Sequence, residues 1–212
     1  SSAPVNANYL AFGYLAPQGE RLVLFGYLYN VTQPNLANAH VLGKLYFGSM
    51  DQAGAIKVAH DFAADILAQF GQKSLAGSRI YFVSDRTGAK EIWSMNWDGT
   101  DQRPITGYNS ISISPEVSKD PRKIAFTTFA RRNPAIFIHS LETGKRLPFY
   151  NQQASMNAHA SFTPDGNRVV FASTATGRSQ LYIASADGSG IERISTSRAI
   201  EVEPKVNPKT GT

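Results

Sequence analysis

The feature that most limits how this chain can fold is a repeat in its second part, with a period of 44 to 45 residues. Three segments align, and their first strands begin at Arg79, Lys123 and Arg168. Twelve residues after the first apolar position of each segment comes a second apolar pair, which is followed by a turn. Self-similarity at such a period indicates one structural unit that is repeated along the chain.

Each copy holds four short segments of β-branched and aromatic residues, separated by turns of Gly, Pro, Asp and Asn, as is typical of strands. Four strands in about 45 residues predict a β-propeller blade. We therefore predict a mainly β fold, a partial β-propeller preceded by a small α/β unit. The three four-stranded blades are expected at residues 79–122, 123–167 and 168–212. Each copy is expected to close with a strand, at residues 115–122, 160–167 and 204–211.

The number of repeats is small for a propeller. Propellers close with roughly four to eight blades, whereas residues 79–212 hold three copies. A blade buries its faces against its neighbours, and open strand edges promote aggregation. We therefore expect that the sequence is a fragment of a longer chain or that its open faces meet another chain. The first strand of each copy, such as residues 80–83, is expected to be covered on both faces.

The first 75 residues show a different pattern. Aromatic-rich segments at residues 8–16 and 20–30 flank Pro17-Gln18-Gly19, which predicts a β-hairpin, and a third strand is expected at residues 41–49. Residues 51–70 carry apolar side chains three and four positions apart, which predicts an amphipathic helix. Asp51 or Ser49 could cap its start and Gly71 its end. The predicted domains are residues 1–75 and residues 76–212.

Composition and motifs exclude several kinds of chemistry. The chain has no Cys, so disulfides, thiolate zinc sites and Cys nucleophiles are excluded. Its four His do not lie at metal-ligand spacing, and neither a Gly-x-Ser-x-Gly elbow nor a Gly-rich phosphate loop is present. We predict no catalytic residues, no metal and no cofactor. The net charge of +5 arises entirely after residue 78 and is scattered, which argues against nucleic-acid binding.

Two sequence motifs carry a resemblance to a known family. The predicted helix reads AHDFAADI at residues 59–66 and is followed by RIYFV at residues 79–83, and a blade end reads FTPDGNRV at residues 162–169. These motifs, from about Asn8 to the C-terminus, resemble the TolB family of periplasmic propeller proteins of the Tol–Pal cell-envelope system. The sequence departs from the family at residues 71–74, GQKS, where a Leu-Thr-Gly motif is usual.

In a propeller, the loops that precede the innermost strands surround one mouth of the central channel. We expect these loops at residues 111–115, 155–160 and 200–204, and call them the propeller mouth. The resemblance implies that the family binds the lipoprotein Pal there. The predicted partner-binding residues are Ser112, Met156, Asn157, His159, Glu201, Val202 and Glu203.

The resulting hypothesis is a non-enzymatic periplasmic protein that docks Pal at the propeller mouth, with TolA as a second partner. Contact with the outer membrane would be through the partner alone. The alternative is the propeller domain of a peptidase or glycosidase whose catalytic part lies outside this sequence. The sequence does not determine the oligomeric state or whether calcium occupies the channel.

Overall fold

The computed structural model describes residues 6–119 and 122–211 of the chain. The chain divides into two compact units, an N-terminal unit, Ser1–Ser78, and a C-terminal unit, Arg79–Thr212. No helix within the described ranges is both long and apolar enough to cross a membrane.

The N-terminal unit is a three-stranded antiparallel sheet, in the order β1-β2-β3, with one long helix. Its elements are β1 (Tyr9–Gln18), β2 (Arg21–Asn30), α1 (Leu36–Ala39), β3 (His40–Ser49) and α2 (Gln52–Gln69). The hairpin turn lies at Gly19 and Glu20, later than expected, because Pro17 and Gln18 still pair with β2. Gly19 has a φ of +61°, a conformation that costs a glycine little. The short helix α1 has no counterpart in the sequence prediction.

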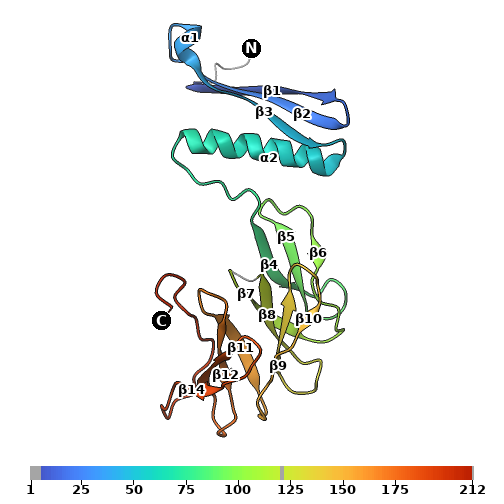
Figure 1. The fold of residues 1–212 in the computed structure, drawn as a ribbon, viewed down its shortest axis with the longest axis vertical. Coiled ribbons are helices and arrows are strands. Elements are labelled where there is room, and N and C mark those ends of the chain that lie inside the picture. Colours follow the sequence, from blue (N-terminus) through green and yellow to red (C-terminus); the bar gives the residue numbers. More distant parts are fainter. Residues whose placement is uncertain (1–5, 120–121, 212) are drawn as a thin grey trace. The chain divides into compact units, whose positions relative to one another are not determined.

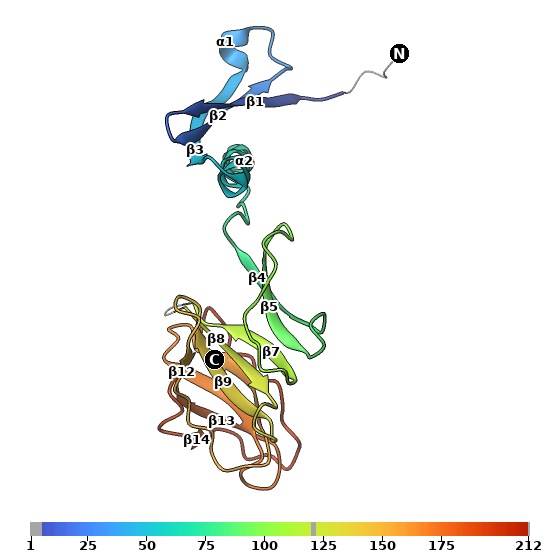
Figure 2. The same ribbon diagram turned by 90° about the vertical axis from the view of Figure 1, so that its right-hand side faces the viewer.

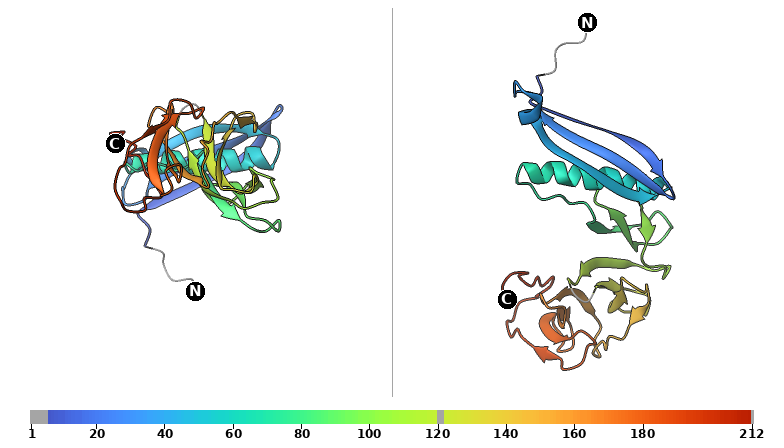
Figure 3. Two further views of the ribbon diagram at one scale, coloured as in Figure 1. Left: turned by 90° about the horizontal axis from the view of Figure 1, so that it is seen from below. Right: turned by 45° about the horizontal axis from the view of Figure 1, so that its top comes forward.

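Helix α2 confirms the predicted amphipathic helix. The Asp51 carboxylate caps it by accepting a hydrogen bond from the Gly54 N–H at 2.7 Å, and Gly71 follows its end with a φ of +68°. The helix lies along one face of the sheet (Figures 1 and 3). Val58 and Phe62 pack there against strand residues. Gly26 permits this approach, since a Cβ at that position would lie 2.7 Å from the Phe62 ring.

The other face of this sheet is aromatic and exposed. Phe12 and Tyr27 stack with ring centroids 5.4 Å apart, and Tyr14 and Phe25 stack at 4.5 Å. Phe12 and Tyr14 nevertheless remain 48% and 55% exposed. Cross-strand aromatic pairs therefore stabilise a face that no described element of this unit covers.

The C-terminal unit consists of three successive antiparallel sheets (Figure 2). The first contains β4 (Arg79–Ser84), β5 (Glu91–Asn96) and β6 (Arg103–Pro104). The second contains β7 (Ser112–Val117), β8 (Lys123–Thr128), β9 (Ala135–Ser140) and β10 (Arg146–Leu147). The third contains β11 (Asn157–Phe162), β12 (Arg168–Ser173), β13 (Gln180–Ser185) and β14 (Glu192–Arg193). Two sheets are thus four-stranded and one is three-stranded, in a mainly β chain.

The sheets are offset from the repeats that we expected. The strand placed at the end of each of the first two sequence repeats begins the next sheet instead, because β7 pairs with β8 and β11 pairs with β12. Only a short connection separates β7 from β8, and strands joined in this way pair with each other as hairpins. The end of the first expected strand, residues 120–121, lies outside the described residues. The third expected strand, residues 204–211, is irregular backbone.

The middle sheet is covered on both faces. Side chains of a strand alternate between the two faces, so Phe126 packs with Ile92 of the first sheet, whereas Ala125 packs with Phe171 of the third. Phe126 and Phe171 are fully buried. The prediction that neighbouring blades share cores is therefore confirmed for this sheet.

The first strand, β4, is covered less than we expected. Ile80 and Val83 remain 42% and 37% exposed. The second sheet packs on one face, with Tyr81 against the shared core. On the other face the Arg86 guanidinium lies 4.5 Å from the Trp93 ring. A long cationic side chain therefore covers part of a surface that we expected an adjacent sheet to bury.

A polar side chain after the last strand of each sheet fixes the same backbone position. Thr106, Asn151 and Ser195 each accept a hydrogen bond from the backbone N–H of an apolar residue in the strand before that last strand, at 2.8 to 2.9 Å. The repeat therefore preserves a hydrogen-bonding position although the residue type changes. In each sheet this bond follows the two-residue last strand.

Candidate functional site

The candidate site is a small hollow at the propeller mouth to which all three repeats contribute. It has a volume of about 200 Å³ and is lined by Ser114, Pro115, His159, Ala160, Glu203, Pro204 and Lys205. Ser114 lies in β7 and His159 in β11, whereas Glu203 belongs to the irregular segment after β14. These three residues occupy equivalent positions of the repeat, 45 and 44 residues apart.

The three equivalent residues share an uncommon backbone conformation. Ser114, His159 and Glu203 have φ values of +54°, +55° and +53°. The register of β7 against β8 shifts beside Ser114, and the register of β11 against β12 shifts beside His159. Such bulges redirect side chains and are frequent beside functional sites. Positive φ costs of the order of 1–3 kcal/mol for residues other than Gly and persists where the surrounding structure enforces it.

A polar network ties these segments together directly beside the hollow. Ser161, which is almost fully buried, donates to Glu116 Oε1 at 3.3 Å and accepts from the Val206 N–H at 3.1 Å. The Lys205 ammonium forms an ion pair with the other oxygen of Glu116. Glu116, Ser161 and Lys205 are again equivalent residues of the three repeats. The network therefore links the equivalent residues of the three repeats to one another across the mouth.

His159 presents a polar atom that has no partner in the described part of the chain. Its backbone N–H donates to Thr127 Oγ1 at 2.9 Å, which anchors the residue to β8. Its Nδ1 atom is enclosed and forms no hydrogen bond with any described residue. Buried polar atoms are normally paired, so this imidazole retains an unused capacity for hydrogen bonding.

The seven predicted partner-binding residues divide into two groups. His159 and Glu203 line the hollow, and half-buried Met156 and 49%-exposed Val202 lie in the same loops. Ser112 and Asn157 are instead buried, because their side chains bond to Thr128 Oγ1 and to the Gln152 carbonyl.

Glu201 is also held inside its own loop. Its carboxylate accepts a hydrogen bond from the Ser195 hydroxyl, and its carbonyl accepts one from Ser179 Oγ at 2.6 Å. Ser112 and Asn157 are therefore buried inside the mouth loops, and the Glu201 carboxylate is already engaged.

The sequence interpretation missed Ser114, Glu116, Ser161 and Lys205. The signal that could have located them is their shared place in the repeat, since each lies within four residues of a predicted position. The backbone conformation brings these four residues together, and no sequence motif indicates that conformation.

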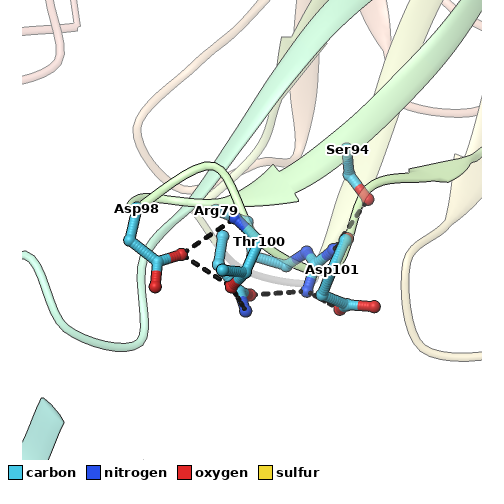
Figure 4. Close-up of polar contacts among 6 residues, drawn as sticks. Arg79, Ser94, Asp98, Thr100 and Asp101 are labelled. Atoms are coloured by element: carbon cyan, nitrogen blue, oxygen red, sulfur yellow. Dashed lines mark hydrogen bonds and ion pairs between the residues drawn. The ribbon is translucent and has the colours of Figure 1, made fainter. Parts of the chain in front are cut away.

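A second polar cluster anchors the beginning of the C-terminal unit (Figure 4). Arg79 donates to Asp101 Oδ2 at 2.7 Å, to Asn96 Oδ1 at 3.0 Å and to Ser94 Oγ at 3.0 Å. The hydrogen bond from Arg79 lowers the pKa of the Asp101 carboxyl group. This fork of hydrogen bonds joins β4 to β5 and to the turn before β6, so Arg79 of the RIYFV motif has a structural role.

The described geometry does not contain a recognisable catalytic arrangement. Ser114, His159 and Glu203 form no hydrogen bonds with one another, whereas an activated nucleophile requires a bond to its base. No group of three or more His, Asp or Glu residues within the described ranges could hold a metal ion. The hollow combines apolar Pro and Ala residues with imidazole, carboxylate and ammonium groups.

Comparison with known proteins identifies relatives along nearly the whole chain. The chain is 28% identical over 205 residues to a protein TolB homolog of Chlorobium chlorochromatii, covering 96% of this chain and 44% of the relative. It is 32% identical over 199 residues to a protein TolB homolog of Chlorobaculum tepidum, covering 91% and 42%. The chain thus spans less than half the length of these relatives.

The solved structure of TolB from Acinetobacter baumannii shows the same fold. It matches 95% of this chain and 50% of its own with a TM-score of 0.78, at 21% sequence identity. The family model described as the TolB beta propeller domain matches residues 67–212. The propeller interpretation of the repeats is thereby confirmed, and this chain belongs to the TolB β-propeller family.

Proposed function

We propose that this chain is part of a periplasmic Tol–Pal component that binds the lipoprotein Pal at the propeller mouth and has no catalytic activity. A relative from Desulfosudis oleivorans that is 27% identical bears the name Tol-Pal system protein TolB. The observation that carries the proposal is the hollow lined by Ser114, His159 and Glu203, three equivalent residues that share a positive φ.

The proposed contact surface consists of the accessible part of the mouth. Met156 and Val202 supply apolar contacts, and a thioether adapts well to a partner surface. His159 and Glu203 line the hollow and supply polar contacts. Ser112 and Asn157 support the loops from inside, and Glu201 fixes the third loop. TolA is proposed as a second partner, and any contact with the outer membrane occurs through the partner.

The test is a calorimetric titration of the chain with the soluble domain of its cognate Pal. We expect the double variant Met156→Ala/His159→Ala to bind at least tenfold more weakly, which is a loss of about 1.4 kcal/mol. The matched control is Ile194→Ala, since Ile194 is 51% exposed and does not line the hollow. Equal affinities of the double variant and the unmodified chain would refute the proposed surface.

A further inference from the structure

A second hollow of the C-terminal unit lies between its second and third sheets. It is an open groove of about 710 Å³. One side is formed by the residues around β10 and the other by the turn between β13 and β14. We call it the arginine groove, and it is lined among others by Arg131, Arg146, Pro148, Tyr150, Asp187 and Ile191. None of these residues lines the hollow at the mouth.

Two arginine side chains of this groove converge on one aromatic ring, that of Phe137, which belongs to the core shared with the first sheet. The Arg146 guanidinium carbon lies 3.6 Å from the centre of the Phe137 ring, and that of Arg131 lies 5.4 Å from it. Phe137 is 2% exposed, so the ring is fixed in the core. Stacking on a ring holds a guanidinium flat and leaves the N–H groups on its edge free to donate.

Neither guanidinium has an anionic partner in the described residues. The ion pairs of the C-terminal unit involve other arginines and lysines, and neither the Arg131 nor the Arg146 guanidinium forms a hydrogen bond within the described ranges. Burial, together with the nearby charge of Arg131, lowers the pKa of Arg146. Two like charges held close together without a counter-charge favour an incoming anion.

The remaining walls of the groove determine what kind of anion fits. Tyr150 is 64% exposed and, with Pro148 and Ile191, offers apolar surface beside the charges. Gly188 fixes this wall, because a Cβ there would lie 2.4 Å from the backbone of Tyr150. Asp187 also lines the groove, and its Oδ1 accepts hydrogen bonds from the backbone N–H and the hydroxyl of Ser189 at 2.9 and 2.7 Å.

Charge complementarity selects the occupant. Residues 79–212 carry 17 Lys and Arg against 12 Asp and Glu, so the unit attracts acidic partners at long range. A carboxylate matches the fork of a guanidinium in two parallel hydrogen bonds. We propose that the arginine groove binds an acidic side chain of a partner protein segment, with a neighbouring apolar side chain of that segment packed against Tyr150 and Ile191.

The test follows the side-chain Nε–Hε signals of arginine by NMR while the chain is titrated with a capped dipeptide, N-acetyl-Glu-Leu-amide. We expect saturable shifts for Arg131 and Arg146. N-acetyl-Gln-Leu-amide should bind at least tenfold more weakly, since the neutral amide cannot form the charge-assisted pair. Inorganic phosphate is titrated in a separate experiment. It should bind more weakly than the acidic dipeptide because it lacks the apolar side chain.

The matched variants remove two charges each. Arg131→Gln/Arg146→Gln should weaken binding at least tenfold, whereas Arg103→Gln/Arg132→Gln, outside the groove, should leave it within twofold. If the first double variant fails to fold, Arg146→Lys takes its place. It retains the charge without the planar fork, so it should show an intermediate loss of dipeptide binding. Absence of saturation, equal binding of the neutral dipeptide, equal or tighter binding of phosphate, or equal losses in both double variants would overturn the proposal.

Discussion

The sheet of the N-terminal unit and the middle sheet of the C-terminal unit are built from similar residues and are buried very differently. In β8 every residue after Lys123 is buried, whereas all of β1 except half-buried Ala16 is exposed. The middle sheet has a neighbouring sheet on each face, but β1–β3 are covered by α2 on one face only. Apolar and aromatic strand composition therefore indicates a strand and does not specify how many of its faces are covered.

The largest expected effect is the loss of a shared core residue. Phe126→Ala should lower the free energy of unfolding of the C-terminal unit by about 3–5 kcal/mol, because it removes a fully buried ring between two sheets. Both tryptophans of the chain, Trp93 and Trp97, lie in this unit, so their fluorescence during urea unfolding reports on it.

The matched control is Phe12→Ala in the N-terminal unit. Phe12 is 48% exposed, so its removal should cost less than about 1.5 kcal/mol, as expected for the loss of aromatic pair contacts alone. The circular dichroism of α2 monitors this unit. Similar losses of unfolding free energy for Phe12→Ala and Phe126→Ala would contradict the conclusion that the two sheets are buried differently.

A smaller effect is expected on the covered face of the N-terminal sheet. Gly26→Ala places a Cβ 2.7 Å from the Phe62 ring and should destabilise the unit by about 1–3 kcal/mol, because the helix must shift outward. Loss of the helical signal at lower urea concentration measures this change. Gly107→Ala is the control, since a Cβ there meets open space and should alter stability by less than about 0.5 kcal/mol. An unchanged urea midpoint for Gly26→Ala would contradict the close packing of α2 on β2.

The smallest effects concern pH and differ between the units. Burial, and secondly the charge of Arg146, lowers the pKa of His139 in the C-terminal unit, where its Nε2 lies 2.8 Å from the Tyr108 hydroxyl. The unfolded chain then binds a proton more readily than the folded one. The stability of this unit is therefore complete above the ordinary His pKa of about 6.5 and falls as the pH drops toward the lower folded value.

In the N-terminal unit the corresponding group is Asp65. Its hydrogen bond from Lys44 lowers its pKa, so the stability it contributes is present above the ordinary value of about 3.9 and is lost as the pH falls through the folded value. Urea midpoints at pH 7, 5.5 and 3.5 should thus separate the two units. In the variants His139→Gln and Asp65→Asn the respective pH dependence should flatten, and an unaltered dependence in both would disprove the assignment.

The sequence predicted the parts of this fold that repeat or that depend on local chemistry. Helix α2 was predicted because Asp51 caps it and its apolar residues recur at helical spacing. The blades were predicted because strand and turn residues recur at one period. The assignment of strands to sheets was wrong, because the period does not state whether the strand at residues 112–117 pairs with the strand before it or after it.

The candidate site was predicted only in part. The loops were located correctly enough to include His159 and Glu203, but Ser112 and Asn157 are buried and Ser114 was missed. The reason is the bulge, which inserts an extra residue and reverses which side chains of the strand face the hollow. Alternation along a regular strand cannot anticipate this reversal.

The most direct test of the central claim, that Pal binds at the propeller mouth, is site-specific photo-crosslinking. A benzophenone amino acid is placed at Val202, which is 49% exposed at the mouth, and in a separate variant at Phe12, which is 48% exposed on the aromatic face of the N-terminal sheet. We predict that the probe at position 202 captures Pal and that the probe at position 12 does not. Capture from position 12 alone, or equal capture from both positions, would contradict the account.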